Sequence, residues 1–295
     1  MISSTEFNPE LNTWRTMAGK VCMVTGATAG IGKVTATTLA DMGAQLVITG
    51  RNPHKTKETA HQIASETGNN SIDYLIADYS DLQQVRDLAD EFKSRYSQLN
   101  VLVNNAGAFF NTRKLTTKGI EMTFLVNHLA PFLLTNLLME NMQNGEPARI
   151  VNVSSDAHKQ GTMDFDNLGF AKGYFGMKAY GRSKLANILF TYELARRLNN
   201  SNITVNALHP GHVATDIWKT NFKIIGPVLK WFMGLIALTP EEGEDNSIYL
   251  ASSTNLEGIT GKYFVKREPV ESSPISYDEV VAQKLWDVSS ELTRF

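Results

Sequence analysis

Tyr180 and Lys184 are two residues whose types and spacing could do acid–base chemistry. They begin a run with helical apolar periodicity, and residues four apart share one face of a helix. A nearby cation favours phenolate over phenol, so we expect Lys184 to lower the pKa of Tyr180 from its usual value of about 10. Such a tyrosine can exchange a proton with a substrate oxygen. The alternative is a solvated surface pair, so the rest of the chain must supply a cofactor and an oxygen-holding group.

The segment that could hold a cofactor begins with a short buried strand at residues 20–25, which runs into a glycine-rich turn. Gly26, Gly30 and Gly32 stand between this strand and a helical pattern at residues 34–42. Glycines there let the backbone approach a pyrophosphate, which the helix N-terminus attracts. The spacing matches neither the Gly-x-Gly-x-x-Gly fingerprint nor a Walker loop. A turn without a ligand is the alternative, and the flanking strand and helix weigh against it.

The residues after the next two expected strands indicate which dinucleotide would bind. Arg51 follows the strand at 45–49, at a place where an acidic residue would hold a ribose hydroxyl and an arginine accommodates a 2′-phosphate. Lys33 could add a second positive charge. We therefore expect NADP rather than NAD. Asp78 follows the strand at 71–77, where it could accept from the adenine amino group or cap a turn, and both roles stay open.

Strands and helices continue to alternate, which predicts an α/β fold with right-handed crossovers and a parallel sheet. Ser154 and Ser155 end the strand at 148–153, and ligands bind at the carboxyl ends of such strands. Asn127 lies within a mostly apolar helical pattern at 115–142. A buried asparagine needs partners, so it either bonds the local backbone or supports a kink and a water chain near the site.

Composition narrows the class of protein. The chain has 295 residues, a net charge of -2 and one cysteine, Cys22. We expect one domain over residues 1–295, with residues 1–18 as an arm outside the core. No charge block suggests a nucleic-acid surface, and no Cys/His cluster has metal spacing. Residues 1–17 have no basic region followed by an apolar run, so we expect no signal peptide, and no segment reaches the roughly 18 uncharged apolar residues of a membrane span. We expect a cytoplasmic protein without a metal.

Residues 221–238 are strongly apolar but contain Lys223 and Lys230. One interpretation is that residues 216–240 form a lid over the substrate. A helix packed in the core or at a subunit interface is nearly as good an interpretation. A third is a helix lying on a membrane surface, which would give peripheral membrane contact.

Several separated motifs now agree in order and spacing. They are TGATAGIG at 25–32, NNAG at 104–107, Asn127, Ser155, Tyr180 with Lys184, and PG at 210–211. Together they resemble the short-chain dehydrogenase/reductase superfamily over residues 20 to about 265. The strings ITGRN, LVNHLAPFLLTNLL, ARIVNVSSDAH, YGRSKLANILFTYELARRL and HPGHVATDI are similar to the retinol dehydrogenase branch, and GKYF and KLWDVSSEL extend that similarity to the C-terminus.

The resemblance implies a doubly wound, Rossmann-like sheet of about seven strands in a three-layer αβα arrangement. It also implies hydride transfer between NADP(H) and a carbonyl/alcohol pair. Tyr180 would be the general acid in reduction and the base in oxidation, and Lys184 would lower its pKa and bind the nicotinamide ribose. Ser155, which matches the family's catalytic serine better than Ser154 does, would polarise the substrate oxygen, and Asn127 would hold a water relay.

The same resemblance, with the strand-end pattern, predicts the cofactor contacts. They are Gly26, Thr28, Gly30, Ile31, Gly32, Arg51, Asp78, Tyr79, Asn105, Ala106, Gly107, Tyr180, Lys184, Pro210, Gly211, Val213 and Thr215.

We expect a lipophilic aldehyde, ketone or alcohol as substrate. The alternatives are a ring substrate (steroid, quinone or protochlorophyllide-like porphyrin precursor) and a non-catalytic NADP-binding sensor or scaffold. The chain has Ala186 where protochlorophyllide reductases have a cysteine, which counts against the photoenzyme. Members of the superfamily often form homo-oligomers.

Overall fold

The structure is a computed structural model that describes four stretches of the chain: residues 16–144, 147–199, 201–211 and 240–295. Most of the expected arm, Val213, Thr215 and the expected lid up to residue 239 lie outside the described residues. Met17, which was expected to lie in that arm, is buried at 2% exposure and its amide donates to the carbonyl of Met42. Met17 therefore belongs to the core and not to an arm, because its side chain packs in the same buried cluster as residues of the first strand and the first helix.

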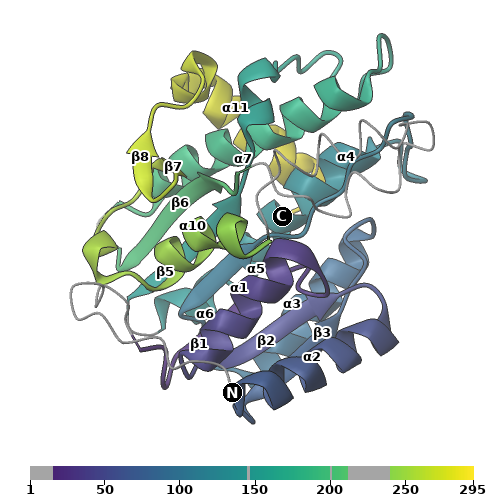
Figure 1. Cartoon of the computed structure of the whole chain (residues 1–295). Helices are drawn as coiled ribbons and strands as arrows, with labels where there is room; N and C mark the ends of the chain where they lie inside the picture. Colours follow the sequence, from purple (N-terminus) through teal and green to yellow (C-terminus); the bar gives the residue numbers. More distant parts are fainter. Residues whose placement is uncertain (1–15, 145–146, 200, 212–239) are drawn as a thin grey trace, which may run out of the picture.

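One sheet organises the described residues (Figure 1), and its strand order is β3-β2-β1-β4-β5-β6-β7-β8. The strands are β1 (Val21–Val24), β2 (Gln45–Gly50), β3 (Ile72–Ile76), β4 (Val101–Asn104), β5 (Ala148–Val153), β6 (Ile203–His209), β7 (Tyr263–Val265) and β8 (Glu268–Val270). Neighbours from β3 to β7 pair parallel, whereas β8 pairs antiparallel with β7. The predicted doubly wound sheet is confirmed, with one short extra strand at its edge.

Helices cover both faces of this sheet (Figure 1). They are α1 (Gly30–Asp41), α2 (Pro53–Thr67), α3 (Leu82–Arg95), α4 (Met122–Phe124), α5 (Ala130–Leu137), α6 (Met139–Gln143), α7 (Gly176–Arg197), α10 (Pro240–Ser252) and α11 (Glu279–Thr293). Alternation along the strands sends side chains to opposite faces. In β1, Cys22 and Val24 pack with α1, α2 and α10, while Met23 packs with α3, α5 and α7. This gives the three predicted layers.

The strand order reverses direction between β1 and β4, which places a crevice at the carboxyl ends of these strands. The loops after β1, β2, β4, β5 and β6 all open at that edge, so residues far apart in the sequence meet there. Among the described residues, no helix combines the length and apolar character needed to cross a bilayer.

The expected helix at 115–142 is wrong in its first part. Residues 105–121 contain no helix, and the chain then passes through α4, a π turn at Leu125–Leu129, α5 and α6. Glu121 starts this run because its carboxylate accepts from the amides of Thr123 and Phe124. The π turn contains Asn127, in place of the regular helix expected there.

Candidate active site

The glycine-rich turn between β1 and α1 is packed closely against the loop that follows β4. Gly26 has φ of +65°, and a Cβ there would lie 2.8 Å from the Cα of Ala106. A Cβ on Gly32 would overlap the side-chain amide of Asn105, which donates to the carbonyl of Thr25 at 2.8 Å. Glycine is required at both positions because one needs the left-handed region and the other a close approach.

The N-terminus of α1 offers backbone N–H groups without a side-chain cap. Ala29 is its N-cap residue and cannot accept a hydrogen bond with its methyl group, whereas Asn52 caps α2 and Asp81 caps α3. The first N–H groups of a helix have no partner within the helix, and they attract phosphate. Ala29, Gly30 and the residues that follow line a cavity, so this end of α1 suits a pyrophosphate.

That cavity has a volume of about 1120 Å³ and runs along the carboxyl ends of the strands. Every predicted cofactor contact that the structure describes lines it: Gly26, Thr28, Gly30, Ile31, Gly32, Arg51, Asp78, Tyr79, Asn105, Ala106, Gly107, Tyr180, Lys184, Pro210 and Gly211. Of the two roles left open for Asp78, the turn role is present, because one carboxylate oxygen accepts from the amide of Ser80 at 2.9 Å. Asp78 also lines the cavity, and its contact with an adenine stays a prediction. The residues present therefore fit a dinucleotide.

The positive charge at the far end of the cavity comes from Arg51 and Lys55. The suggestion that Lys33 contributes is wrong, because its Nζ lies 3.2 Å from Gln62 Oε1 and 3.9 Å from a carboxylate oxygen of Glu66, both on α2. Sequence reasoning missed Lys55. Lys55 lies in the first turn of the helix that follows Arg51, and this position in the sequence could have predicted a second positive charge beside Arg51.

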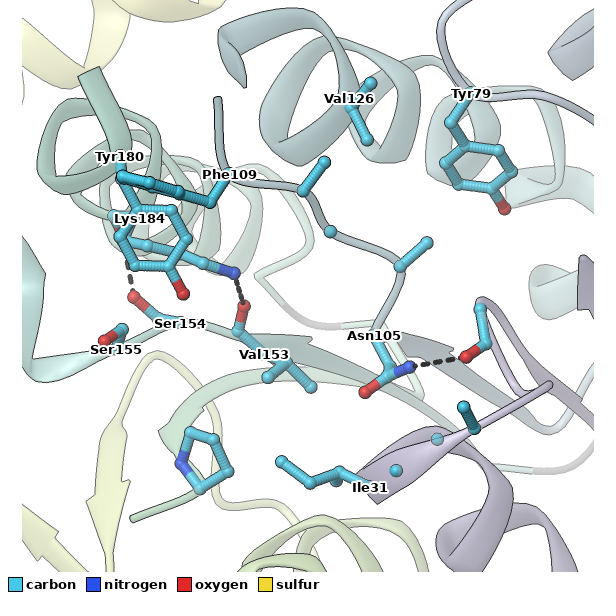
Figure 2. Close-up of a pocket in the computed structure, with 18 of the residues that line it drawn as sticks. Ile31, Tyr79, Asn105, Phe109, Val126, Val153, Ser154, Ser155, Tyr180 and Lys184 are labelled. Carbon is cyan, nitrogen blue, oxygen red and sulfur yellow. Dashed lines mark hydrogen bonds between the residues drawn. The ribbon is translucent and has the colours of Figure 1, made fainter. Parts of the chain in front are cut away.

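At the other end, Tyr180, Lys184 and Ser155 come together (Figure 2). Tyr180 and Lys184 lie in the first half of α7, and the Lys184 Nζ is 5.5 Å from the centre of the Tyr180 ring. That ammonium donates to the carbonyl of Val153 at 2.9 Å, which ties α7 to the end of β5. Ser155 and Tyr180 line the same cavity, whereas the Ser154 hydroxyl is engaged by donating to the Lys184 carbonyl at 2.8 Å. The choice of Ser155 as the catalytic serine stays a prediction.

Burial dominates the pKa values of this group. It raises the pKa of Tyr180 to about 12, although the nearby Ser155 side chain opposes the change. It also lowers the pKa of Lys184 to about 8. The expectation that the Tyr180 pKa lies below its usual value is therefore wrong for the protein alone, because burial raises it. Near neutral pH Tyr180 keeps its proton, which is the form that can donate one.

Asn127 lies beside this group and is almost fully buried. Its amide donates to the carbonyl of Ala108 and to Ser183 Oγ, both at 2.9 Å, and its carbonyl accepts from the amide of Ala108 at 2.7 Å. Asn127 does not line the cavity, although its neighbour Val126 does. Of the two roles left open, the bond to the backbone is present: it joins the π turn to the loop after β4 and to α7.

An apolar wall lies next to Tyr180. It consists of Phe109, Phe110, Met122, Val126 and Met177. Phe109 meets Tyr180 edge to face with ring centres 6.0 Å apart (Figure 2). Sequence reasoning missed this wall, because Phe109 and Phe110 lie in the stretch without helix or strand before α4.

Comparison with known proteins agrees with this geometry. A family model described as short chain dehydrogenase matches residues 20–224. The chain belongs to this family. Retinol dehydrogenase 14 of Homo sapiens is 41% identical in an alignment that covers 92% of this chain and 86% of that protein. Polyprenol dehydrogenase of Homo sapiens is 37% identical over 93% of this chain and 85% of that protein. The chain is thus a short-chain dehydrogenase of the retinol dehydrogenase-like branch, an oxidoreductase that acts on alcohol and carbonyl groups.

Solved structures show the same fold. An uncharacterised protein from Mycobacterium paratuberculosis is 30% identical and superimposes with a TM-score of 0.78, covering 95% of this chain and 96% of that one. The RhlG/NADP active-site complex of Pseudomonas aeruginosa is 25% identical with a TM-score of 0.70, covering 86% and 97%. Short-chain dehydrogenases bind a nicotinamide cofactor, and the cavity described above is where this chain has room for one.

Proposed function

We propose that this short-chain dehydrogenase uses NADP(H) to interconvert a lipophilic aldehyde or ketone and the corresponding alcohol. The observation that carries the proposal is one continuous cavity with unlike ends. Arg51 and Lys55 line one end, and Tyr180 with Ser155 lies at the other beside a largely apolar wall, where the Lys114 ammonium lies 5.1 Å from the centre of the Phe110 ring. The end with Arg51 and Lys55 suits a phosphorylated cofactor, and the largely apolar wall suits a lipophilic substrate.

The preference for NADP over NAD rests on Arg51 and Lys55. Both side chains are exposed at the cavity, close to the start of α2, and no carboxylate stands directly after β2 to receive a ribose hydroxyl. An arginine presents paired donors that match a phosphate. The NADP complex of the similar Pseudomonas aeruginosa protein is consistent with this preference.

When bound, the nicotinamide supplies the hydride, and the chain supplies position and proton. Tyr180, protonated near neutral pH, would donate its proton to the substrate oxygen in reduction, while Ser155 holds that oxygen by a hydrogen bond. Lys184, pinned to the Val153 carbonyl, would keep positive charge near the phenolate left behind. Asn127 would hold a water relay through which Tyr180 regains a proton. The hydrogen bonds between the Asn127 side chain and the Ala108 backbone fix Asn127 beside Tyr180, Ser155 and Lys184.

The lipophilic substrate rests on the apolar wall and on the names of two relatives, a retinol dehydrogenase and a polyprenol dehydrogenase. If the substrate chain lies against this wall, each added methylene contributes about 0.8 kcal/mol of binding, or roughly a fourfold rise in kcat/KM. The test is NADPH oxidation, followed by absorbance, with straight-chain aldehydes of increasing length. Equal kcat/KM values across that series would contradict a lipophilic substrate.

A matched pair of variants tests whether the dependence of kcat/KM on aldehyde length comes from the apolar wall. Met177 lines the cavity, whereas Lys178, the next residue on α7, is exposed and does not. Met177→Gln keeps the length of the side chain but makes it polar, so it should flatten the dependence on aldehyde length. Lys178→Gln should leave that dependence as in the wild type. A chain-length dependence that survives in Met177→Gln would remove this residue from the substrate wall.

A further inference from the structure

His158 is a buried histidine that lies three residues after Ser155, in the 3₁₀ helix Asp156–Gln160. Its two ring nitrogens have partners on opposite sides. Nδ1 lies 2.7 Å from the carbonyl oxygen of Ser155, and Nε2 lies 3.0 Å from the backbone nitrogen of Ser273. A carbonyl only accepts and a backbone N–H only donates, so the ring is neutral and carries its proton on Nδ1. The two bonds thus fix the tautomer without any further group.

These bonds act on the backbone that sets the direction of the Ser155 side chain. The Ser155 carbonyl accepts twice, from the His158 ring and from the His158 amide at 3.0 Å. The Ser155 hydroxyl caps the same 3₁₀ helix by accepting from the amide of Ala157 at 3.2 Å, and the side chain lines the cavity together with Tyr180. A peptide unit held in this way leaves the Ser155 side chain little freedom to turn out of the cavity.

The segment that contains Ser273, the partner of His158 Nε2, is itself held in place by several contacts. It precedes the 3₁₀ helix Pro274–Tyr277, between β8 and α11. Its neighbour Ser272 is 2.8 Å from the Tyr192 hydroxyl and 2.6 Å from Ser276 Oγ, so the segment is attached to α7 as well. The ring of His158 also packs edge to face on Tyr263 of β7, with centres 4.9 Å apart. Ser273 lies well beyond residue 224, where the match to the family model ends.

We propose that His158 is a positioning residue, which joins the C-terminal segment at Ser273 to the backbone of Ser155 and so keeps the Ser155 side chain in the cavity that it shares with Tyr180. His158 touches neither the cavity nor Tyr180 and acts only through Ser155. The inference rests on the proposed roles of Ser155 and Tyr180. It assigns the stretch around Ser273 a share in catalysis, since without that stretch the His158 ring loses the partner that orients it.

Three substitutions separate the two bonds. His158→Asn places an amide N–H near the position of Nδ1 and can keep the bond to Ser155. His158→Gln places its amide near Nε2, so it can keep Ser273 but loses Ser155. His158→Phe loses both and keeps a ring on Tyr263. The assay measures kcat per NADPH-binding site in the full-length protein, with binding sites counted by NADPH titration, so that unfolded protein does not count.

We expect His158→Phe and His158→Gln to lower kcat per site by roughly tenfold or more, because misplacement of a catalytic group is costly, while the Kd for NADPH stays near the wild-type value. His158→Asn should recover part of the rate, because it keeps the bond to Ser155 without the support of Ser273. Tyr192→Phe loosens the same segment at Ser272, so it should lower kcat per site by less than His158→Phe does. In the double variant with Ser155→Ala, His158→Phe should slow the enzyme no further than Ser155→Ala alone.

The idea is overturned if Gln and Asn variants have equal rates, or if the effects of His158→Phe and Ser155→Ala multiply. Should His158→Phe fail to fold, the comparison of Asn with Gln still decides. If Ser155→Ala itself keeps full activity, the proposed function of Ser155 fails. A slow Ser155→Ala variant together with a fast His158→Gln variant would overturn the positioning role alone.

Discussion

His128 gives a prediction whose size follows from burial. It lies in the π turn at Leu125–Leu129 with 1% exposure, and its Nε2 is 2.9 Å from Ser289 Oγ of α11. The rings of Phe124, Phe132 and Phe190 surround it. Burial lowers the pKa of His128 to about 3, although the nearby Asn187 side chain opposes the change. The ring is therefore neutral in the folded protein at any pH the enzyme would meet.

The sign of the pH dependence follows directly. In the unfolded chain a histidine has a pKa of about 6.5, so below that pH the unfolded state takes up a proton that the folded state refuses. The contribution of His128 to stability is complete above about pH 6.5 and is lost as the pH falls toward 3. Each pH unit in this window costs about 1.36 kcal/mol, which gives ~2 kcal/mol by about pH 5.

The measurement is urea unfolding of the wild type and of His128→Gln at about pH 7.5 and about pH 5. Glutamine does not titrate, so the wild type should lose ~2 kcal/mol more than the variant between the two conditions. His158, whose pKa burial also lowers, acts alike in both proteins and cancels in the difference. Equal losses in wild type and His128→Gln would refute the reasoning.

Three further changes test the cofactor site. Arg51→Asp should lose a charge-assisted bond worth about 1.5–3 kcal/mol and add repulsion, so the ratio of NADPH to NADH dissociation constants should reverse; an unchanged ratio would remove Arg51 from the site. Lys55→Gln should weaken NADPH binding by roughly 0.2–1 kcal/mol and leave NADH unaffected, while Lys57→Gln, on the same helix but away from the cavity, changes neither. Gly32→Ala should displace Asn105 and destabilise the fold by about 1–3 kcal/mol, seen as a lower urea midpoint together with weaker NADPH binding; wild-type values for both would contradict the close packing.

The sequence predicted the part of the site that depends on where parallel strands end. Gly26, Arg51 and Ser155 each follow a strand, and the topology brings the carboxyl ends of those strands to one edge. Tyr180 and Lys184 were predictable because they share a helix face. Each prediction used only the residues near a strand end or on one helix face, together with the rule that ligands bind at the carboxyl ends of parallel strands.

The rest depends on contacts between distant residues, which a local pattern does not contain. The His158 ring is fixed by Ser273, 115 residues away, and the apolar wall includes Phe109 from a stretch without regular structure. The pKa of Tyr180 was predicted with the wrong sign because the sequence shows the neighbouring Lys184 but not the burial that outweighs it. The π turn at Asn127 replaced an expected regular helix for the same reason: its bonds run to Ala108 and Ser183.

The central claim is that Tyr180 supplies the proton while the rest of the cavity binds cofactor and substrate. Tyr180→Phe removes one hydroxyl from a buried ring and leaves its edge contact with Phe109, so the fold and the cofactor cavity should stay intact. The measurement is kcat for NADPH-dependent reduction of a long-chain aldehyde, with the Kd for NADPH determined on the same protein. We expect kcat to fall by about 10²–10⁴-fold with Kd nearly unchanged. A Phe variant that keeps most of the wild-type kcat would contradict the account.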